Sequence, residues 1–300
     1  MEGEEGQQFY QKVISATRDL ISSCIWKEAN TKTLEKWVSY FKSDDEKVLC
    51  ALILDSLTFR SSSQTKAIID HALEQSIPQA LLCDGVTLNF DIYRTITARN
   101  GKPNRSLRIV PVIREKDPPT KSGPLVARLY KREVGVNEKY MIWPWSVESI
   151  NEEPSIIVMI DDFVGTGDQF LDFFERFLSG LPAKGDTHFI YAPLGACEQG
   201  LERIKRDLPY VSVCCAESIG QRERFFEGMM LRYPGTSLAF QNKMRKTYLE
   251  LMSRLGLDFI KNKFGYGDLE LTYAYAHGTP NATLPILWAE TESFQPLLSR

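Results

Sequence analysis

The chain has 300 residues, of which 43% are hydrophobic, which is enough for one large packed domain or for a medium domain with a smaller one. Its formal net charge of −3 gives no indication of a general nucleic-acid-binding surface, and its apolar runs are far too short to span a bilayer. The acidic, polar residues 1–6 are the opposite of a signal peptide.

The cysteines and histidines indicate a reducing compartment and disfavour a metal or triad site. No Cys-x-x-Cys pair occurs among the six cysteines, and no histidine lies at metal-ligand spacing from them. Cys214 and Cys215 are adjacent in an apolar stretch, where buried thiols are expected. Three histidines give no support for a zinc site or a Ser-His-Asp triad. We therefore expect a cytoplasmic protein.

Residues 1–80 are predicted to form an N-terminal helical region. Between Leu34 and Phe41, apolar side chains repeat at i, i+3, i+4 and i+7, which is one face of a helix. Residues 43–46, Ser-Asp-Asp-Glu, are typical of a capping box that opens the next helix. Pro78 closes the region. We expect a helical layer that packs on an α/β core or faces a partner protein.

Residues 107–113 form the first expected strand, and a loop over residues 114–123 follows it. Pro111 is atypical of a central strand. The loop contains side chains and a glycine suited to bind phosphate groups: Arg114, Lys116, Lys121, Ser122 and Gly123. An ordinary proline-containing loop accounts for the same residues equally well, so both interpretations stay open. Residues 125–134 are then predicted to be a helix.

The most informative stretch begins with an unbroken apolar run, residues 156–160, which predicts a strand buried on both faces. Asp161 and Asp162 follow at its carboxyl end, and residues 165–167, Gly-Thr-Gly, form a short turn. Over residues 170–178, apolar side chains recur at helical spacing. This order of strand, acidic turn and helix puts the turn where open α/β sheets bind ligands.

The chemistry of this turn favours a ribose 5-phosphate site. Gly165 and Gly167 let backbone amides approach a ligand, and the following helix directs unpaired N–H groups and the positive end of its dipole at the turn. Together they predict a phosphate cradle, to which Thr166 adds a hydroxyl donor. Asp161 and Asp162 are better placed to accept hydrogen bonds from sugar hydroxyls, or to hold Mg²⁺ with waters. A purely structural turn is the alternative.

The rest of the chain alternates strand and helix before the pattern changes. Residues 187–194 and 211–216 are expected strands separated by a helix over 196–208, which predicts right-handed parallel βαβ units. From residue 218 the alternation stops, and residues 238–259 are predicted to form a long helix. The expected fold class is therefore α/β, with a parallel-sheet core, an N-terminal helical layer and a C-terminal extension.

The central stretch resembles the PRPP-binding loop of type I phosphoribosyltransferases, in which an apolar strand, two acidic residues and two variable residues precede a Thr-Gly-rich turn. Asp161 and Asp162 match the acidic pair, and Thr166 and Gly167 match the central Thr-Gly. The variant Asp-Asp-Phe-Val-Gly-Thr-Gly-Asp-Gln is similar to divergent phosphoribosyltransferase-like domains of bacterial conflict (anti-phage) systems. Some of those domains are encoded beside retron reverse transcriptases.

The C-terminal segment 277–288 carries a second resemblance to the same group, whose members end in Pro-Asn-Asn-Thr-Leu-Pro and a later Trp. Asn281, Thr283 and Trp288 match this ending, while Ala282 departs from the second Asn. The side chains of Asn281 and Thr283 are suited to bind a base or a phosphate, although a capped turn explains them as well. The two motifs together extend the resemblance over most of the chain.

The resemblance implies a type I phosphoribosyltransferase-like core that binds PRPP or a ribose 5-phosphate nucleotide. The implied reaction is transfer at ribose C1 with release of pyrophosphate, or cleavage of an N-glycosidic bond. Asp161 and Asp162 would act at the ribose, directly or through Mg²⁺. The 5-phosphate would contact the Gly-Thr-Gly turn with Asp168 and Gln169, two residues that replace small ones usual in the family. Pyrophosphate would contact the 114–123 loop.

Further expectations concern organisation and partners. Residues 1–80 would form the helical region and residues 81–300 the phosphoribosyltransferase-like domain with its C-terminal elaboration. The aromatic segment 140–145 would contribute to a flap over the reacting centre, as in the resembled families, or be packed edge structure. A defence-system protein is the implied partner, with no membrane and no nucleic acid. A non-catalytic nucleotide-sensing module of the same fold is the alternative, and a structural protein without a ligand is the third option.

Overall fold

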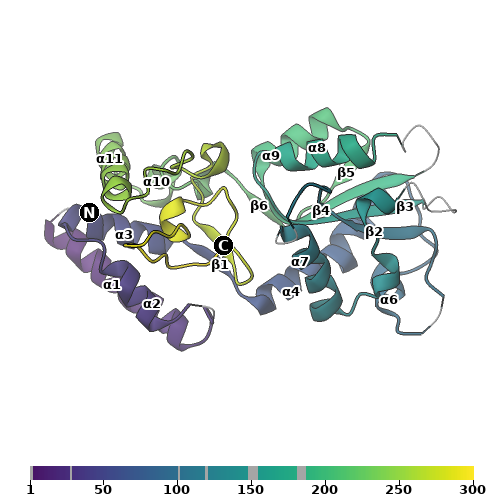
Figure 1. The fold of residues 1–300 in the computed structure, drawn as a ribbon, viewed down its shortest axis with the longest axis horizontal. Coiled ribbons are helices and arrows are strands. Elements are labelled where there is room, and N and C mark those ends of the chain that lie inside the picture. The colour runs from purple at the N-terminus through teal and green to yellow at the C-terminus, as the bar shows by residue number, and fades with distance from the viewer. Residues whose placement is uncertain (1–2, 28, 101, 119–120, 148–154, 181–186) are drawn as a thin grey trace. The chain divides into compact units, whose positions relative to one another are not determined.

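Figure 1 shows the computed structural model, which describes residues 3–27, 29–100, 102–118, 121–147, 155–180 and 187–300. The chain forms two compact units. The terminal unit consists of Met1–Ser63 and Gly220–Arg300, and the central unit consists of Gln64–Ile219. The boundary expected near residue 80 falls inside the central unit, within α5 (Ile77–Cys83), and the N-terminal helices share a unit with the C-terminal segment.

The central unit is built on a parallel five-stranded sheet. Its strands lie in the order β2 (Leu107–Pro111), β3 (Ile156–Val164), β4 (His188–Cys197) and β5 (Val211–Val213), and β6 (Glu217–Ile219) pairs with the end of β4. All of these pairings are parallel, which confirms the predicted α/β class. The apolar run 156–160 is buried throughout, as expected for a strand covered on both faces.

Pro111 is accommodated because β2 lies at the edge of the sheet. It occupies the last register position of the strand, opposite Ile160 of β3. Proline donates no hydrogen bond to a ladder, and an edge strand tolerates that loss better than a central one. The ladder resumes at once, since the Val112 amide donates to the Ile160 carbonyl at 2.9 Å.

Helices cover both faces of this sheet. α8 (Asp168–Phe177) and α9 (Glu198–Asp207) lie on one face, and α7 (Ser122–Leu129) lies on the other (Figure 1). Phe170, Phe173 and Phe174 of α8 are buried in a cluster with strand residues, so the predicted amphipathic helix forms and docks through its apolar face. The remaining helical elements of this part of the chain are α4 (Ser62–His71), η1 (Ala72–Ser76), α5, α6 (Ile92–Thr97), η2 (Tyr130–Val134), η3 (Glu138–Tyr140) and η4 (Pro144–Ser146).

The terminal unit is mainly helical. Its elements are α1 (Gly3–Ser22), α2 (Thr31–Val38), α3 (Asp44–Ser56), β1 (Thr58–Arg60), η6 (Gln221–Glu223), α10 (Met229–Arg232), α11 (Leu238–Arg254), η7 (Tyr266–Asp268), β7 (Tyr273–Tyr275) and η8 (Pro285–Leu287). α3 is its core helix, since every residue from Val48 to Leu54 is buried. The predicted capping box forms, with Ser43 and Glu46 exchanging hydrogen bonds of 3.2 and 3.1 Å. Within the described ranges, no helix is both long and apolar enough to cross a bilayer.

The C-terminal motif packs against a glycine-rich segment of the same unit. Gly265 adopts a left-handed conformation with φ +81°, and a Cβ there would lie 2.1 Å from the Ala282 carbonyl oxygen. The Tyr266 amide donates to the Asn281 carbonyl at 2.8 Å. The backbone of the motif therefore approaches residue 265 so closely that only glycine fits.

Candidate functional site

The acidic pair lies at the carboxyl end of β3, and its two members differ in environment. Asp161 is only 2% exposed, whereas Asp162 is half-buried. One Asp161 carboxylate oxygen accepts a 2.9 Å hydrogen bond from the Tyr191 hydroxyl of β4, and the other accepts from the Asp162 amide at 3.0 Å. The Tyr191 ring stacks on Phe170 of α8 with 3.6 Å between centroids. Asp161 is thus enclosed by β4 and α8, and Asp162 is the more accessible carboxylate.

Electrostatics sharpen this difference. Burial raises the pKa of Asp161 well above its ordinary value, and the charge of Asp162 raises it further, against the opposing hydrogen bond from Tyr191. Burial, followed by the charge of Asp161, likewise raises the pKa of the Tyr191 hydroxyl. Asp161 therefore keeps its proton to a higher pH than an exposed aspartate. It is suited to hold the end of β3 in place rather than to contact a ligand.

The Gly-Thr-Gly turn enters α8 through a glycine in the left-handed conformation. Gly167 is the residue before the helix and has φ +85°, a conformation that favours glycine. A Cβ on Gly167 would lie 3.2 Å from both the Gly200 carbonyl oxygen and a side-chain carbon of Ile204. A Cβ on Gly200 of α9 would lie 2.3 Å from the Gly165 carbonyl oxygen. The backbone of α9 therefore packs directly against the turn and fixes its path.

A short polar network closes this turn. The Thr166 hydroxyl donates to one carboxylate oxygen of Asp168 at 2.6 Å. Arg203 of α9 donates through one guanidinium nitrogen to the other Asp168 oxygen at 2.5 Å and to the Thr166 carbonyl at 3.3 Å. Asp168 is the first residue of α8, where a negative charge is favoured by the helix dipole. Thr166, Asp168 and Arg203 are thus joined in one hydrogen-bonded network at the start of α8.

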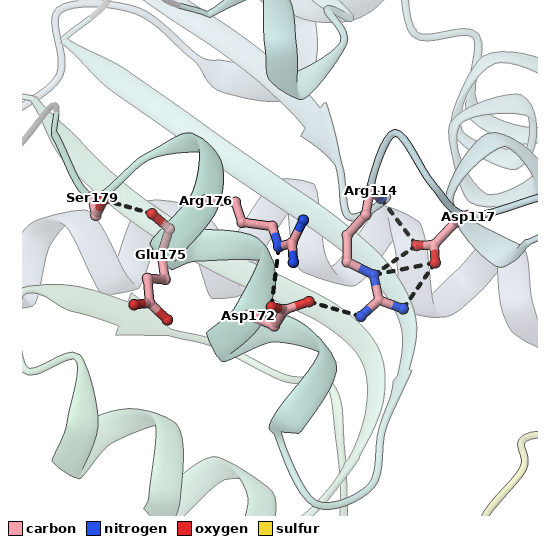
Figure 2. Close-up of polar contacts among 6 residues, drawn as sticks. All are labelled: Arg114, Asp117, Asp172, Glu175, Arg176 and Ser179. Atoms are coloured by element: carbon pink, nitrogen blue, oxygen red, sulfur yellow. Dashed lines mark hydrogen bonds and ion pairs between the residues drawn. The ribbon is translucent and has the colours of Figure 1, made fainter.

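The loop after β2 reaches the same edge of the sheet and is tied to α8. Figure 2 shows Arg114 between two carboxylates: it donates to Asp117 of its own loop and, at 2.8 Å, to Asp172 of α8. Asp172 also accepts from Arg176 at 3.1 Å. Hydrogen bonds to Asp117 and then Asp172 raise the pKa of Arg114, which stays charged. In this structure Arg114 therefore ties the loop to α8, because its guanidinium N–H groups donate to Asp117 and Asp172.

The other predicted residues of this loop surround the start of α7. Lys116 is exposed, and Lys121 precedes the helix in an extended conformation. Ser122 is the first residue of α7. A Cβ on Gly123 would lie 2.8 Å from the Val112 carbonyl oxygen, so the helix begins in close contact with the strand end. Residues 119–120, which belong to the predicted loop, lie outside the described residues.

Comparison with known protein families identifies the family of this chain. The family model PRTase-CE matches residues 34–300. The chain belongs to the PRTase-CE family. The match confirms the phosphoribosyltransferase-like domain predicted from the central and C-terminal motifs. Among solved structures, the AQ2163 protein from Aquifex aeolicus is similar at 13% identity with a TM-score of 0.31, covering 64% of this chain and 86% of that chain, which carries no argument about function. No curated protein matches the chain.

The PRTase-CE match includes the C-terminal motif, whose predicted ligand residues lie in the terminal unit. Thr283 is fully buried, and its hydroxyl donates to the Tyr273 carbonyl at 2.6 Å. Asn281 is exposed, and its carbonyl accepts from Tyr266. The contacts of Thr283 are those of a core residue. The structure does not bring these two residues into the unit that contains the acidic pair.

The aromatic segment expected to cover the site lies at the far end of α8. Trp143 and Trp145 are partly exposed and stack with 5.2 Å between centroids and an interplanar angle of 6°. Trp145 contacts Phe177, the last residue of α8, whereas the Gly-Thr-Gly turn precedes the first. The stacked pair therefore lies beside the last turn of α8, and the neighbouring Ile142 amide donates to the Ile109 carbonyl of β2 at 3.0 Å.

Gly200 and Arg203 are among the contributors to the site that were not singled out from the sequence. Gly200 carried a usable signal, because a glycine inside the amphipathic pattern of residues 196–208 lowers helix propensity and often marks a close approach. Arg203 carried none, because charged residues are ordinary on the outer face of such a helix. Only the packing of α9 on the turn identifies it.

The donor set fits Mg²⁺ shared with a phosphate ligand better than a cation held by protein alone. Within the described part of the chain, no cluster of three or more His, Cys, Asp or Glu residues is arranged to hold a metal. Both oxygens of Asp161 accept hydrogen bonds from Tyr191 and the Asp162 amide. Asp162, the more accessible of the two, is the carboxylate that would hold such a cation.

Proposed function

We propose that the central unit of this PRTase-CE protein binds PRPP or another ribose 5-phosphate nucleotide at the carboxyl edge of its sheet. The proposed reaction is transfer at ribose C1 with release of pyrophosphate, or cleavage of an N-glycosidic bond. The observation that carries the proposal is the turn between β3 and α8, where left-handed Gly167 opens the helix beside half-buried Asp162. Family membership supports it.

The 5-phosphate would lie at the start of α8. Backbone N–H groups of the first helical turn and the helix dipole favour an anion there. Left-handed Gly167 lets the turn enter α8 tightly against α9, and the half-exposed Thr166 and Gln169 offer further donors.

The ribose would lie beside Asp162, which accepts hydrogen bonds from its hydroxyl groups. Asp161 would act through its neighbour, since it accepts from the Asp162 amide and from Tyr191. The Asp161 carboxylate accepts from the Asp162 backbone, so the buried member of the pair fixes the position of the accessible one. Asp161 is thus proposed as a positioning residue.

Pyrophosphate would be bound by the loop before α7. Lys116, Lys121 and Ser122 supply charge and donors there, and the close packing of Gly123 brings the backbone amides at the start of α7 to the edge of the sheet. Arg114 would hold this loop on α8 through Asp172. Asp162 would hold Mg²⁺, and the cation would supply positive charge to offset that of the departing group.

The chemistry asked of the protein is mainly positioning and charge stabilisation. The bond from C1 to pyrophosphate breaks with its electron pair leaving on the phosphate oxygen, and the acceptor forms its bond to an oxocarbenium-like carbon. Holding the phosphate, ribose and pyrophosphate at three fixed places lowers the entropic part of the barrier. Cationic and amide donors stabilise the leaving group.

The test combines calorimetric titration with PRPP and an assay of pyrophosphate release. We expect binding and release by the wild type and loss of both in Asp162→Asn, with an unchanged circular dichroism spectrum. Glu202→Gln, a carboxylate change at an exposed position of α9, is the matched control. Wild-type activity in Asp162→Asn would refute the ribose assignment.

A nucleotide-sensing module without turnover is the second candidate. It is favoured by one observation, the Asp168 carboxylate that already engages Thr166 and Arg203 at the phosphate position. Calorimetric binding of PRPP without pyrophosphate release would support it over the enzyme.

The resemblance to conflict-system domains supports a biological role in the cytoplasm as an anti-phage defence effector with a protein partner. Plating phage on cells that carry the wild-type gene or the Asp162→Asn gene tests this role. Equal phage titres on both would count against a defence function of this site.

A further inference from the structure

The phosphate turn of this protein contains an anion of its own. Asp168 places its carboxylate at the start of α8 and accepts from the Thr166 hydroxyl at 2.6 Å and from Arg203 at 2.5 Å. Both donors are ones that an incoming phosphate would use. The carboxylate stands where the resembled type I phosphoribosyltransferases usually have a small residue.

A phosphate and this carboxylate compete for one place. The start of a helix favours one negative charge, and a second charge within about 4 Å repels it. Asp168 and Arg203 are both partly exposed at their side chains, 45% and 39%, so the pair can separate without opening the core. Rotation of Asp168 toward solvent would release the Thr166 hydroxyl and the guanidinium together.

Arg203 is placed to exchange partners. Arg203 belongs to α9, whose backbone packs closely against the turn at Gly200. Its Nε lies 3.6 Å from a carboxylate oxygen of Asp207, one helical turn away. Its Nη1 also donates to the Thr166 carbonyl, which keeps the guanidinium at the turn when the carboxylate leaves. A planar guanidinium held in this way suits bidentate binding of a phosphate.

We propose that Asp168 is a built-in competitor for the ligand's 5-phosphate, and that Arg203 passes from Asp168 to the phosphate when the ligand binds. This inference rests on the proposed function of the central unit. It makes Asp168 a determinant of specificity: a ligand enters the turn only if its phosphate competes successfully with the carboxylate, which discriminates against ligands with a single weak negative charge.

The test is NMR titration of the full chain with ribose 5-phosphate, and with ribose as the ligand lacking the phosphate. Asp168→Asn keeps the size of the side chain and removes its charge, so it should tighten ribose 5-phosphate binding by about tenfold or more. Arg203→Gln should weaken that binding by about tenfold to a hundredfold, the range for one hydrogen bond to a charged group. Neither variant should change ribose binding.

Controls separate this proposal from the function on which it rests. Glu202→Gln removes a carboxylate at an exposed position of the same helix, and should leave ribose 5-phosphate affinity unchanged. Asp168→Ser, a second uncharged variant that can still cap the helix, should tighten binding as Asp168→Asn does. If the wild type binds ribose 5-phosphate and both Asp168 variants bind it equally or more weakly, the competitor is refuted while the phosphate site stands. If neither the wild type nor any variant binds it, both proposals fail.

Discussion

Replacing Gly200 by alanine adds one methyl group where α9 lies closest to the phosphate turn. The new Cβ would be 2.3 Å from the Gly165 carbonyl oxygen and 2.9 Å from a Val164 side-chain carbon, whereas ordinary contacts begin near 3.4 Å. The turn and the helix must therefore separate by about 1 Å. Overpacking of this kind costs about 1–3 kcal/mol, and the better helix propensity of alanine returns about 1 kcal/mol. We expect a net loss of about 0–2 kcal/mol.

The functional loss should be much larger than the loss of stability. For a unit of about 150 residues, 1 kcal/mol shifts the melting temperature by about 2–4 °C. A displacement of about 1 Å in a group that positions substrate costs about a hundredfold in rate. Thermal melting followed by circular dichroism and the pyrophosphate-release assay measure the two effects on the same sample.

Gly180→Ala is the matched control for this change. Gly180 follows α8 at its far end, and a Cβ there meets no atom within 4 Å. Its variant should melt and react like the wild type. If Gly200→Ala also retains wild-type activity, the close packing of α9 does not set the geometry of the turn, and the proposed phosphate site loses its main structural support.

Four further predictions follow from the same contacts. Gly167→Val should weaken ribose 5-phosphate binding by more than Thr166→Ala, which removes about 1.5–3 kcal/mol, while ribose binding changes little; equal losses on both ligands would show that Gly167 serves only the fold. Folding raises the pKa of Asp161, so the protonated carboxyl stabilises the fold fully below about pH 4, and this contribution is lost as pH rises through the raised pKa of the folded state. The free energy of unfolding in urea should therefore decline less from pH 4 to 8 in Asp161→Asn than in the wild type. Excess chelator should abolish pyrophosphate release, and full activity in its presence would refute Mg²⁺ binding at Asp162. Thr283→Val should cost about 1–3 kcal/mol in urea unfolding because it leaves the Tyr273 carbonyl without its buried donor, with PRPP affinity unchanged.

The strand, turn and helix at residues 156–178 were predictable because each is specified locally. A continuous apolar run indicates a buried parallel strand, a change to helical period indicates α8, and glycines mark the turn between them. The same holds for the capping box of α3, whose hydrogen bonds join Ser43 to a residue only three positions away. Local patterns of this kind involve few residues and no unknown partners.

Other features depend on segments that meet only in the folded chain. Whether Pro111 disrupts the sheet depends on β2 being an edge strand, which the order of the strands decides. The role of Arg114 depends on Asp172, which lies 58 positions later on α8. The interpretation of Thr283 depends on the Tyr273 carbonyl beneath it. In each case the residue type fits a surface role equally well, so sequence reasoning had no basis for choosing.

The acidic pair shows how far the partner of a residue decides its chemistry. Two adjacent aspartates after a strand are identical in sequence terms, and both were predicted to face a ligand. Tyr191 donates to the Asp161 carboxylate and stacks on Phe170, so Asp161 is enclosed, whereas Asp162 stays half-buried. Burial then raises the pKa of Asp161 and leaves Asp162 as the more accessible carboxylate of the pair. Asp161 thus stabilises the end of β3 and positions Asp162. In the turn, Asp168 likewise makes internal hydrogen bonds, because it accepts from Thr166 and Arg203, the donors that the ligand's phosphate would use.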